Sequence, residues 1–249
     1  MTAPRRVALV TGGARRIGAR ITRTLHAAGV DVAVHCLRAT AEAEALAAEL
    51  NDVRVESVRV FRADLCDAAA LAPLVEGAAR WQGRLDFLVN NASSFYATPV
   101  GAIDAASWDD LVGSNLRAPL FLSQAAAPWL AEARGSIVNL VDVHAERPLR
   151  GYVVYSVAKA GLVTLTRALA QELGPAVRVN AVAPGANVWP DDAAVLSLEA
   201  RAEMLRKVPL VRAGTPEDVA DAVRFLLLEA PYVTGQVLAV DGGLSVVMG

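Results

Sequence analysis

The sequence contains little of what a metal centre or a disulfide framework requires. Its 249 residues include two cysteines, Cys36 and Cys66, and three histidines. Two cysteines are too few for a disulfide framework, and neither has metal-ligand spacing to another cysteine or histidine. The histidines form no His-x-x-x-His pair, so we assign no metal site. Both cysteines are expected to be reduced thiols in the core.

An excess of charge of one sign is also missing. The 24 Lys and Arg nearly balance the 26 Asp and Glu, which gives no electrostatic reason to bind nucleic acid or an anionic membrane. The apolar runs are broken every few residues, and none approaches the roughly 18 residues that a membrane span needs. Arg5 and Arg6 lead straight into a strand-like run, without the apolar core of a signal peptide. We therefore expect a cytoplasmic protein whose partner is a small molecule.

Short β-branched runs alternate with alanine-rich helical stretches along the chain. The runs predict seven strands, at 6–11, 31–36, 55–61, 87–89, 136–141, 177–182 and 236–240. The stretches between them predict helices at 16–28, 40–50, 67–81, 113–132, 152–173 and 216–228. This alternation predicts a seven-stranded parallel sheet flanked by helices, the doubly wound Rossmann-type α/β fold. No composition shift marks a linker, so we expect a single domain over 1–249.

Residues 187–208 do not fit the alternation of strands and helices. The run from Trp189 to Asp192 interrupts any helix before the amphipathic stretch 198–205. An insertion just beyond a strand end often acts as a lid over the substrate. We expect such a lid here, and the alternative is an irregular surface loop.

The first predicted strand ends in a glycine-rich turn that runs directly into a helix. Gly12 and Gly18 permit a tight turn there, so that backbone N–H groups at the start of the helix face a pyrophosphate. After the second strand, the basic pair His35 and Arg38 stands where an NAD site usually carries an acidic residue. Arg16 and Arg38 suit a ribose 2′-phosphate, because guanidinium groups pair with phosphate oxygens. The pattern favours NADPH, and the alternative is a solvated basic surface.

Three further residues indicate proton transfer. Tyr155 and Lys159 are four residues apart in a predicted helix, so the phenol and the ammonium share one face. A nearby lysine cation favours the phenolate and lowers the pKa of Tyr155 toward a useful range. Asp142 follows a predicted strand, and doubly wound folds bind their ligands at the carboxyl ends of strands. We expect Asp142 and Tyr155 to converge on one reacting atom, the alternative being that Asp142 only caps a turn. An ionised Asp142 would raise the pKa of Tyr155 against the effect of Lys159, so the pair is expected to titrate as a coupled unit, and the sequence does not assign the proton.

Together the motifs resemble the short-chain dehydrogenase/reductases over essentially the whole chain. The resemblance is carried by the glycine-rich turn, Asp64-Leu65, Asn90-Asn91-Ala92, Asn115, Tyr155 with Lys159, Pro184-Gly185 and Val240-Asp241-Gly242-Gly243. It implies that Lys159 holds the nicotinamide ribose and that Asn115 orders a proton-relay water. The remaining cofactor contacts that it implies are Asp64 near the adenine, Asn91 and Ala92 along the channel, and Ile17, Leu65, Pro184 and Gly185.

Two departures from the common pattern look like the pteridine reductase subgroup of that family. Arg16 replaces the second glycine of the turn, and Asp142 replaces the usual catalytic serine. The run from Ser93 to Tyr96 is similar to the pterin-binding segment of the subgroup. The resemblance implies that Phe95 stacks a pterin against the nicotinamide, while Ser93 and Arg16 hydrogen-bond the pterin or the cofactor phosphate. Trp189 is expected to close over the pterin side chain, or else simply to pack.

The resulting hypothesis is transfer of a hydride from NADPH to a dihydropterin (dihydrobiopterin, dihydromonapterin or dihydrofolate), giving a tetrahydropterin. Tyr155, helped by Asp142 and Lys159, protonates the adjacent ring nitrogen. One alternative is a carbonyl reductase acting on a 3-oxoacyl, sugar or steroid substrate, against which Asp142 and Phe95 argue. The alternative from another class is a non-catalytic NADPH sensor, against which the retained catalytic residues argue. The resemblance also implies a homotetramer, with the long helices of the second half packed across an interface.

Overall fold

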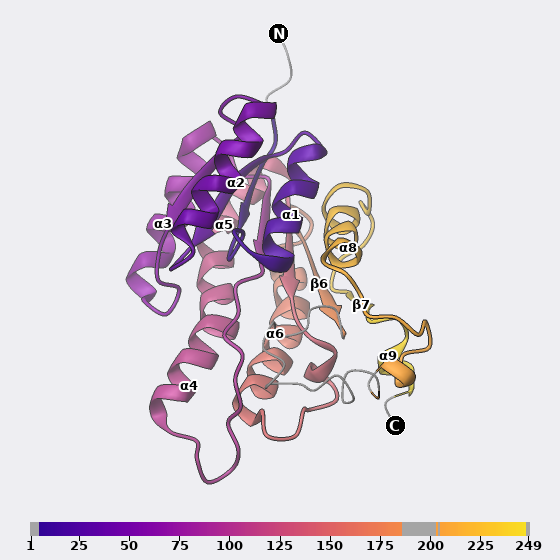
Figure 1. The fold of residues 1–249 in the computed structure, drawn as a ribbon. Helices are drawn as coiled ribbons and strands as arrows, with labels where there is room; N and C mark the ends of the chain where they lie inside the picture. The colour runs from indigo at the N-terminus through magenta and orange to yellow at the C-terminus, as the bar shows by residue number, and fades with distance from the viewer. Residues whose placement is uncertain (1–4, 186–202, 204, 248–249) are drawn as a thin grey trace.

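The computed structural model describes residues 5–185, 203 and 205–247. At its centre is a sheet of seven parallel strands in the order β3-β2-β1-β4-β5-β6-β7 (Figure 1). The strands are β1 (Val7–Val10), β2 (Asp31–Cys36), β3 (Val58–Arg62), β4 (Phe87–Asn90), β5 (Ser136–Leu140), β6 (Arg178–Pro184) and β7 (Val237–Val240). This topology confirms the predicted doubly wound α/β fold.

Helices cover both faces of the sheet. They are α1 (Arg16–Ala27), α2 (Thr40–Val53), α3 (Ala68–Gln82), α4 (Ala105–Val112), α5 (Ala118–Ala133), α6 (Val153–Glu172), α8 (Pro216–Leu228) and α9 (Leu244–Val247). α1, α2 and α8 pack on one face, whereas α3, α5 and α6 pack on the other. Each face therefore has its own apolar layer.

β1 shows why the strands read as continuous apolar runs. Successive side chains of a strand point to opposite faces. Ala8 and Val10 pack in the layer of α1, α2 and α8, whereas Val7 and Leu9 pack in the layer of α3 and α5. All four are fully buried. A strand that is covered on both sides has no solvent face, so apolar and polar residues do not alternate along it.

The helix predicted over 113–132 begins earlier and is interrupted. α4 starts after Asp104, whose carboxylate accepts a hydrogen bond from the N–H of Ser107 in a capping box. A π-helical turn, Gly113–Arg117, then joins α4 to α5. The start was missed because this box has serine where glutamate or glutamine is the usual signal. The interruption brings Asn115 of the π-turn behind the site described below.

α6 corrects the expectation that no segment resembles a membrane span. It is the one helix in the described part of the chain that is long and apolar enough to cross a membrane by length and composition. Half of that segment is buried inside the protein. The helix packs on β6 and carries Tyr155 and Lys159 on its buried side. Its apolar composition is therefore that of a core helix.

The expected lid over 187–208 lies largely outside the described residues, and so does Trp189. Of that stretch, the structure describes only residue 203 and residues 205–208. The lid and the single domain over 1–249 stay predictions.

The strand order reverses beside β1, which pairs with β2 on one side and β4 on the other. Connections leave the sheet in opposite directions at this point, which opens a crevice at the carboxyl ends of the strands. The glycine-rich turn follows β1 and Asn91 follows β4. The Asn91 amide donates to the carbonyl oxygens of Thr11 and Gly12, at 2.9 and 3.1 Å. The glycine-rich turn and Asn91, which are far apart in sequence, therefore meet at this crevice.

Candidate active site

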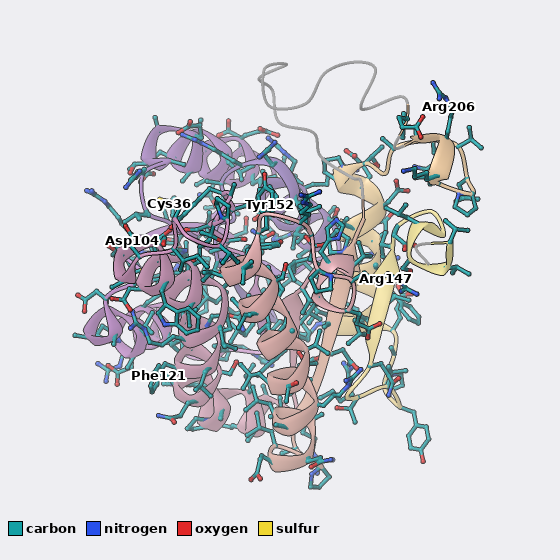
Figure 2. The ribbon with its side chains drawn as sticks, turned by 90° about the horizontal axis from the view of Figure 1, so that it is seen from below. Cys36, Asp104, Phe121, Arg147, Tyr152 and Arg206 are labelled. Atoms are coloured by element: carbon teal, nitrogen blue, oxygen red, sulfur yellow. The ribbon has the colours of Figure 1, made fainter. Side chains whose placement is uncertain are left out.

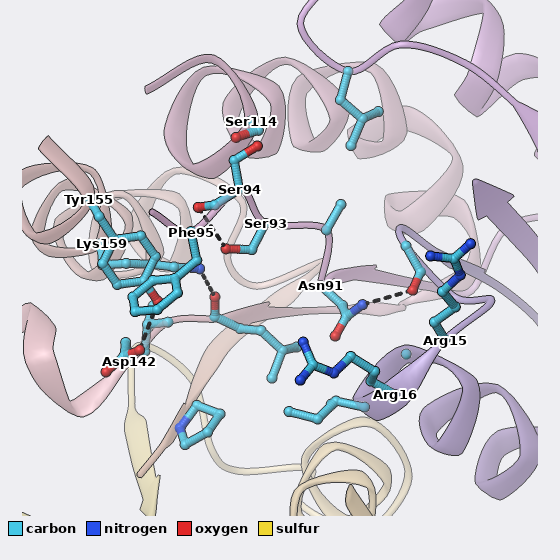
Figure 3. Close-up of a pocket in the computed structure, with 18 of the residues that line it drawn as sticks. Arg15, Arg16, Asn91, Ser93, Ser94, Phe95, Ser114, Asp142, Tyr155 and Lys159 are labelled. Atoms are coloured by element: carbon cyan, nitrogen blue, oxygen red, sulfur yellow. Dashed lines mark hydrogen bonds between the residues drawn. The ribbon is translucent and has the colours of Figure 1, made fainter. Parts of the chain in front are cut away.

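A cavity of about 850 Å³ opens at this crevice (Figure 3). It brings together all of the described candidate residues except Asn115. The candidates that line it are Gly12, Arg16, Ile17, Gly18, His35, Arg38, Asp64, Leu65, Asn91, Ala92, Ser93, Phe95, Asp142, Tyr155, Lys159, Pro184 and Gly185. Their individual roles remain predictions, which the local geometry sharpens in several places.

The glycine-rich turn fits a dinucleotide on steric grounds. Gly12 has φ +60°, a left-handed conformation that glycine adopts readily. A Cβ atom added at Gly18 would lie 2.0 Å from the carbonyl oxygen of Gly12. The start of α1 therefore lies against the turn, as dinucleotide folds require for backbone N–H groups to face a pyrophosphate. The residues present suit a nicotinamide dinucleotide cofactor.

Arg16 has a backbone conformation that usually belongs to glycine, with φ +50°. Holding a larger residue there costs about 1–3 kcal/mol, and such strain clusters at functional sites. Figure 3 shows the Arg16 side chain reaching into the cavity and Arg15 turned another way. Arg15 forms an ion pair with Glu42 at 2.5 Å. The geometry therefore favours Arg16, together with the exposed cavity residue Arg38, as the pair that meets an anionic group.

His35 does not supply the positive charge that the sequence suggested. Its Nδ1 accepts the N–H of Gly12 at 3.1 Å, so the proton is on Nε2, which donates to the carbonyl oxygen of Ala63 at 3.1 Å. The ring is only 2% exposed, and burial lowers the pKa of His35. The imidazole is therefore neutral, and it ties the glycine-rich turn to the end of β3.

Asp142 and Tyr155 converge, as the sequence predicted. The Tyr155 hydroxyl donates to one carboxylate oxygen of Asp142 at 2.7 Å. The other carboxylate oxygen accepts the N–H of His144 at 2.8 Å. The two interpretations of Asp142 thus hold together, because one oxygen caps a turn while the other contacts the phenol.

Burial and the neighbouring Asp142 shift the proton affinities of Tyr155 and Lys159. Burial lowers the pKa of Lys159 from 10.5 to about 8, with partial opposition from the charge of Asp142. Burial raises the pKa of Tyr155 well above its ordinary value, and the charge and hydrogen bond of Asp142 raise it further. The Lys159 ammonium donates to the carbonyl oxygen of Leu140 at 2.8 Å and not to the phenol. Tyr155 therefore stays protonated and can act as a proton donor.

Phe95 forms an apolar wall beside this proton donor. Its ring stacks on Tyr152, with centroids 4.7 Å apart and planes inclined by 14°. It meets the edge of Tyr155 at 4.8 Å and 79°. Phe95 is 50% exposed, which rules out simple core packing. A flat aromatic substrate could lie against such a wall, because offset stacking contributes about 0.5–1.5 kcal/mol beyond buried area.

Asn115 lies behind the wall and is fully buried. Its side-chain oxygen accepts the hydroxyl of Ser93 at 2.7 Å. Its side-chain nitrogen donates to the carbonyl oxygens of Ser94 and Leu111, both at 2.9 Å. These hydrogen bonds hold the segment that leads to Phe95, and the ordering of a proton-relay water by Asn115 stays a prediction.

Sequence reasoning missed several residues of the site. Those that line the cavity are Arg15, Leu37, Cys66, Ser94, Asp110, Ser114, Leu140, Val141, His144, Leu149, Tyr152 and Leu244. Thr11 was also missed, although its hydroxyl accepts the N–H groups of Asn91 and Ala92 at 2.9 and 3.0 Å. A polar residue at the end of an apolar strand was the signal for Thr11. An aromatic residue one helical turn before Tyr155 was the signal for Tyr152.

The sheet, the cradle for a dinucleotide and the Tyr155/Lys159 pair define a Rossmann-type oxidoreductase. The family described as enoyl-(acyl carrier protein) reductase matches residues 12–245. The chain belongs to this family of short-chain dehydrogenase/reductases, which confirms the resemblance found in the sequence, and it is a reductase that uses NAD(P)H.

Individual relatives differ in their substrates. A pteridine reductase 1 from Leishmania tarentolae is 40% identical over 285 aligned positions, which cover 98% of this chain and 97% of that protein. A protein named as a ketoacyl reductase of the granaticin polyketide synthase of Streptomyces violaceoruber is 41% identical over 95% of each chain. A 3-oxoacyl-[acyl-carrier-protein] reductase from Staphylococcus aureus is 36% identical, over 95% of this chain and 97% of its own. Overall identity therefore does not select one substrate class.

Proposed function

We propose that the protein is an NADPH-dependent pteridine reductase that converts a dihydropterin into the tetrahydropterin. The observation that carries this proposal is the hydrogen bond between Tyr155 and Asp142 beside the exposed ring of Phe95. A serine hydroxyl suits a developing alkoxide, whereas reduction of a C=N bond requires a proton on nitrogen. A carboxyl group next to the phenol supports that second chemistry. The similarity to a pteridine reductase supports the same choice.

Four residues would hold the phosphate groups of the cofactor. The turn with Gly12 and Gly18 would face the pyrophosphate, and the guanidinium groups of Arg16 and Arg38 would meet a 2′-phosphate. The absence of an acidic residue from the positions after β2 supports NADPH over NADH. When bound, NADPH supplies a hydride for a carbon of the pterin ring.

Residues of the chain itself donate the proton that the reaction requires. Tyr155 donates its proton to the ring nitrogen beside the reduced carbon, which leaves a phenolate. The nearby Lys159 ammonium, whose pKa is about 8, stabilises that phenolate electrostatically. Asp142 lies within hydrogen-bond distance of the phenol, and solvent protons then restore the starting state. Phe95 and Tyr152 hold the flat ring beside the donor and exclude water from one of its faces.

A 3-oxoacyl reductase is the second candidate, because two of the relatives described above are named as a ketoacyl reductase and a 3-oxoacyl reductase. It would use the same fold and cofactor. Asp142 argues against it, since a carboxylate beside the phenol opposes formation of an alkoxide at the same place.

We also infer a cytoplasmic homotetramer. Exposed apolar side chains on α5 and α6 support an interface there, among them Leu120, Phe121 and Val157. Phe121 lies at the outer surface of α5 in Figure 2. Light scattering on the purified protein would give four chain masses if this inference holds, and one chain mass would refute it.

The decisive experiment measures NADPH oxidation with 7,8-dihydrobiopterin, dihydromonapterin and dihydrofolate, beside an acetoacetyl thioester. The wild-type protein is compared with Asp142→Ser. We expect pterin turnover that methotrexate inhibits and that the variant loses by roughly 100-fold, a typical size for general acid catalysis. Turnover of the thioester alone would overturn the pteridine proposal and leave the oxidoreductase class intact.

A further inference from the structure

Helix α6 carries the proton donor in its first turn, yet it has no capping side chain from its own N-terminus. Tyr152 occupies the N-cap position and makes no side-chain cap hydrogen bond. The first N–H groups of any helix lack an intrahelical partner, and a missing cap lets the first turn fray. Tyr155 is the third residue of α6, so fraying would displace its hydroxyl.

Thr98 supplies the missing cap from a distant segment. Its hydroxyl accepts the N–H of Val154 at 3.2 Å. Its own backbone N–H donates to the carbonyl oxygen of Gly151 at 2.6 Å, and it forms a parallel β-bridge with Tyr152. Thr98 is 2% exposed. A hydrogen bond in such a dry environment is stronger than one in water, and the N–H of Val154 would be costly to leave unpaired.

The same segment carries the aromatic wall. Phe95 precedes Thr98 by three residues in the chain. At one end of the segment, the Phe95 ring contacts Tyr152 and Tyr155. At the other end, Thr98 binds the first turn of α6 through its hydroxyl and backbone. Ring contacts and hydrogen bonds therefore connect the wall to the proton donor, although about 60 residues separate Phe95 from Tyr155 in sequence.

We propose that Thr98 is a positioning residue that sets the placement of the Phe95 wall relative to the Tyr155 hydroxyl. Thr98 does not line the cavity, and it acts through Val154 and Tyr152. The proposal rests on the proposed function in one respect, the use of Phe95 as the wall that a substrate contacts. It adds a residue that neither the family motifs nor the cavity identifies.

The test uses substitutions that separate the hydroxyl from the rest of the residue. Thr98→Val keeps the shape and the backbone contacts and removes the hydroxyl, while Thr98→Ser keeps the hydroxyl. Thr98→Ala also lacks the hydroxyl and reveals any folding defect peculiar to valine. Thr215→Val is the matched control, because the Thr215 hydroxyl caps α8 by accepting the N–H of Asp218. Thr215 is absent from the cavity lining.

Three quantities are measured for each variant: the melting temperature, hydrogen exchange of peptides covering the start of α6, and kcat and KM with 7,8-dihydrobiopterin and NADPH. Exchange is measured on the protein without substrate. For Thr98→Val and Thr98→Ala we expect exchange at the start of α6 to be faster by roughly fivefold, the effect of losing one cap. We expect kcat/KM for dihydrobiopterin to fall roughly tenfold, because small misplacements of reacting groups are costly. The KM for NADPH should not change.

Thr98→Ser should restore exchange and kcat/KM to near the wild-type values. Thr215→Val should lower the melting temperature and leave the exchange at α6 and both KM values unchanged. The proposal is overturned if Thr98→Val and Thr98→Ala exchange and turn over like the wild type, if Thr98→Ser does not rescue them, or if Thr215→Val gives the same kinetic loss. If the wild-type protein reduces no pterin, the proposed function fails, and the exchange measurement still decides whether Thr98 holds the first turn of α6.

Discussion

The two halves of the cavity are held in place by different kinds of contact. In the cofactor half, the turn 11–18 and Asn91, Gly18 lies too close to the Gly12 backbone for any side chain, and the Asn91 amide bonds the carbonyl oxygen of Gly12. In the substrate half, the segment 93–98 and the start of α6, side chains make the connections through stacked rings and hydroxyl groups. The first half therefore tolerates almost no added atom, whereas the second half can be altered in small steps.

Gly18→Ala is expected to have the largest effect, because it breaks the cofactor half. The added Cβ would lie 2.0 Å from the carbonyl oxygen of Gly12, so the turn or α1 must shift. We expect a loss of about 3 kcal/mol in the free energy of unfolding, typical of severe overpacking, measured by urea denaturation. NADPH binding, measured by fluorescence, should be lost.

Gly29→Ala is the control for this prediction. Gly29 also has a positive φ, +82°, but an added Cβ there would meet nothing within 4 Å. It should cost about 1–2 kcal/mol from the backbone conformation alone and leave NADPH binding unchanged. Normal NADPH binding by Gly18→Ala would show that the tight turn is not what holds the cofactor.

Tyr155→Phe tests the substrate half with the next largest effect. It keeps the ring that contacts Phe95 and removes the hydroxyl that donates to Asp142. We expect kcat to fall roughly 1,000-fold, as for loss of a general acid, while KM for the pterin stays within about threefold. Tyr232→Phe, which alters a fully exposed tyrosine, should behave like the wild type in the same assay. A large rise in KM with kcat retained would instead assign Tyr155 to binding.

The contrast between the halves also explains what the sequence could and could not predict. The cofactor half was recognisable because its residues form local motifs, such as the glycine-rich turn after β1. The strands were recognisable because burial on both faces gives continuous apolar runs. In the substrate half, Thr98 and Tyr152 were missed because their partners come together only in the folded chain. A motif with fixed spacing cannot encode such contacts.

The sequence does not determine two protonation states within the recognised motifs. The sequence predicts a basic His35, but the charge of the imidazole depends on burial and on the N–H of Gly12, which the sequence does not show. For the phenol of Tyr155, the sequence predicts two opposing effects, a lowering of the pKa by Lys159 and a raising of the pKa by an ionised Asp142. In the fold, the lysine bonds Leu140 while Asp142 bonds the phenol. Residue types were predictable, whereas proton positions required the tertiary structure.

Arg16→Gly tests the comparison by removing a side chain from the cofactor half. It should raise KM for NADPH by about tenfold or more, the effect of losing a charge-assisted hydrogen bond, and leave KM for NADH almost unchanged. Glycine also adopts φ +50° without strain, so the protein should keep or gain stability toward urea. Arg20→Ala, which removes an exposed ion pair to Glu217 outside the cavity lining, should change neither KM by more than about twofold. An equal rise in KM for NADPH and for NADH would show that Arg16 does not bind a 2′-phosphate.

The smallest effect is expected from pH, which changes one charge in the substrate half without changing its shape. Lys159 has a pKa of about 8, so it is an ammonium below that pH and neutral above it. The cation stabilises the phenolate that forms when Tyr155 gives up its proton, and that stabilisation disappears as pH rises through the pKa. We therefore expect kcat for dihydrobiopterin to fall severalfold above pH 8. Lys159→Met, which cannot titrate, should have low activity without this step, and an identical step in that variant would assign the titration to another group.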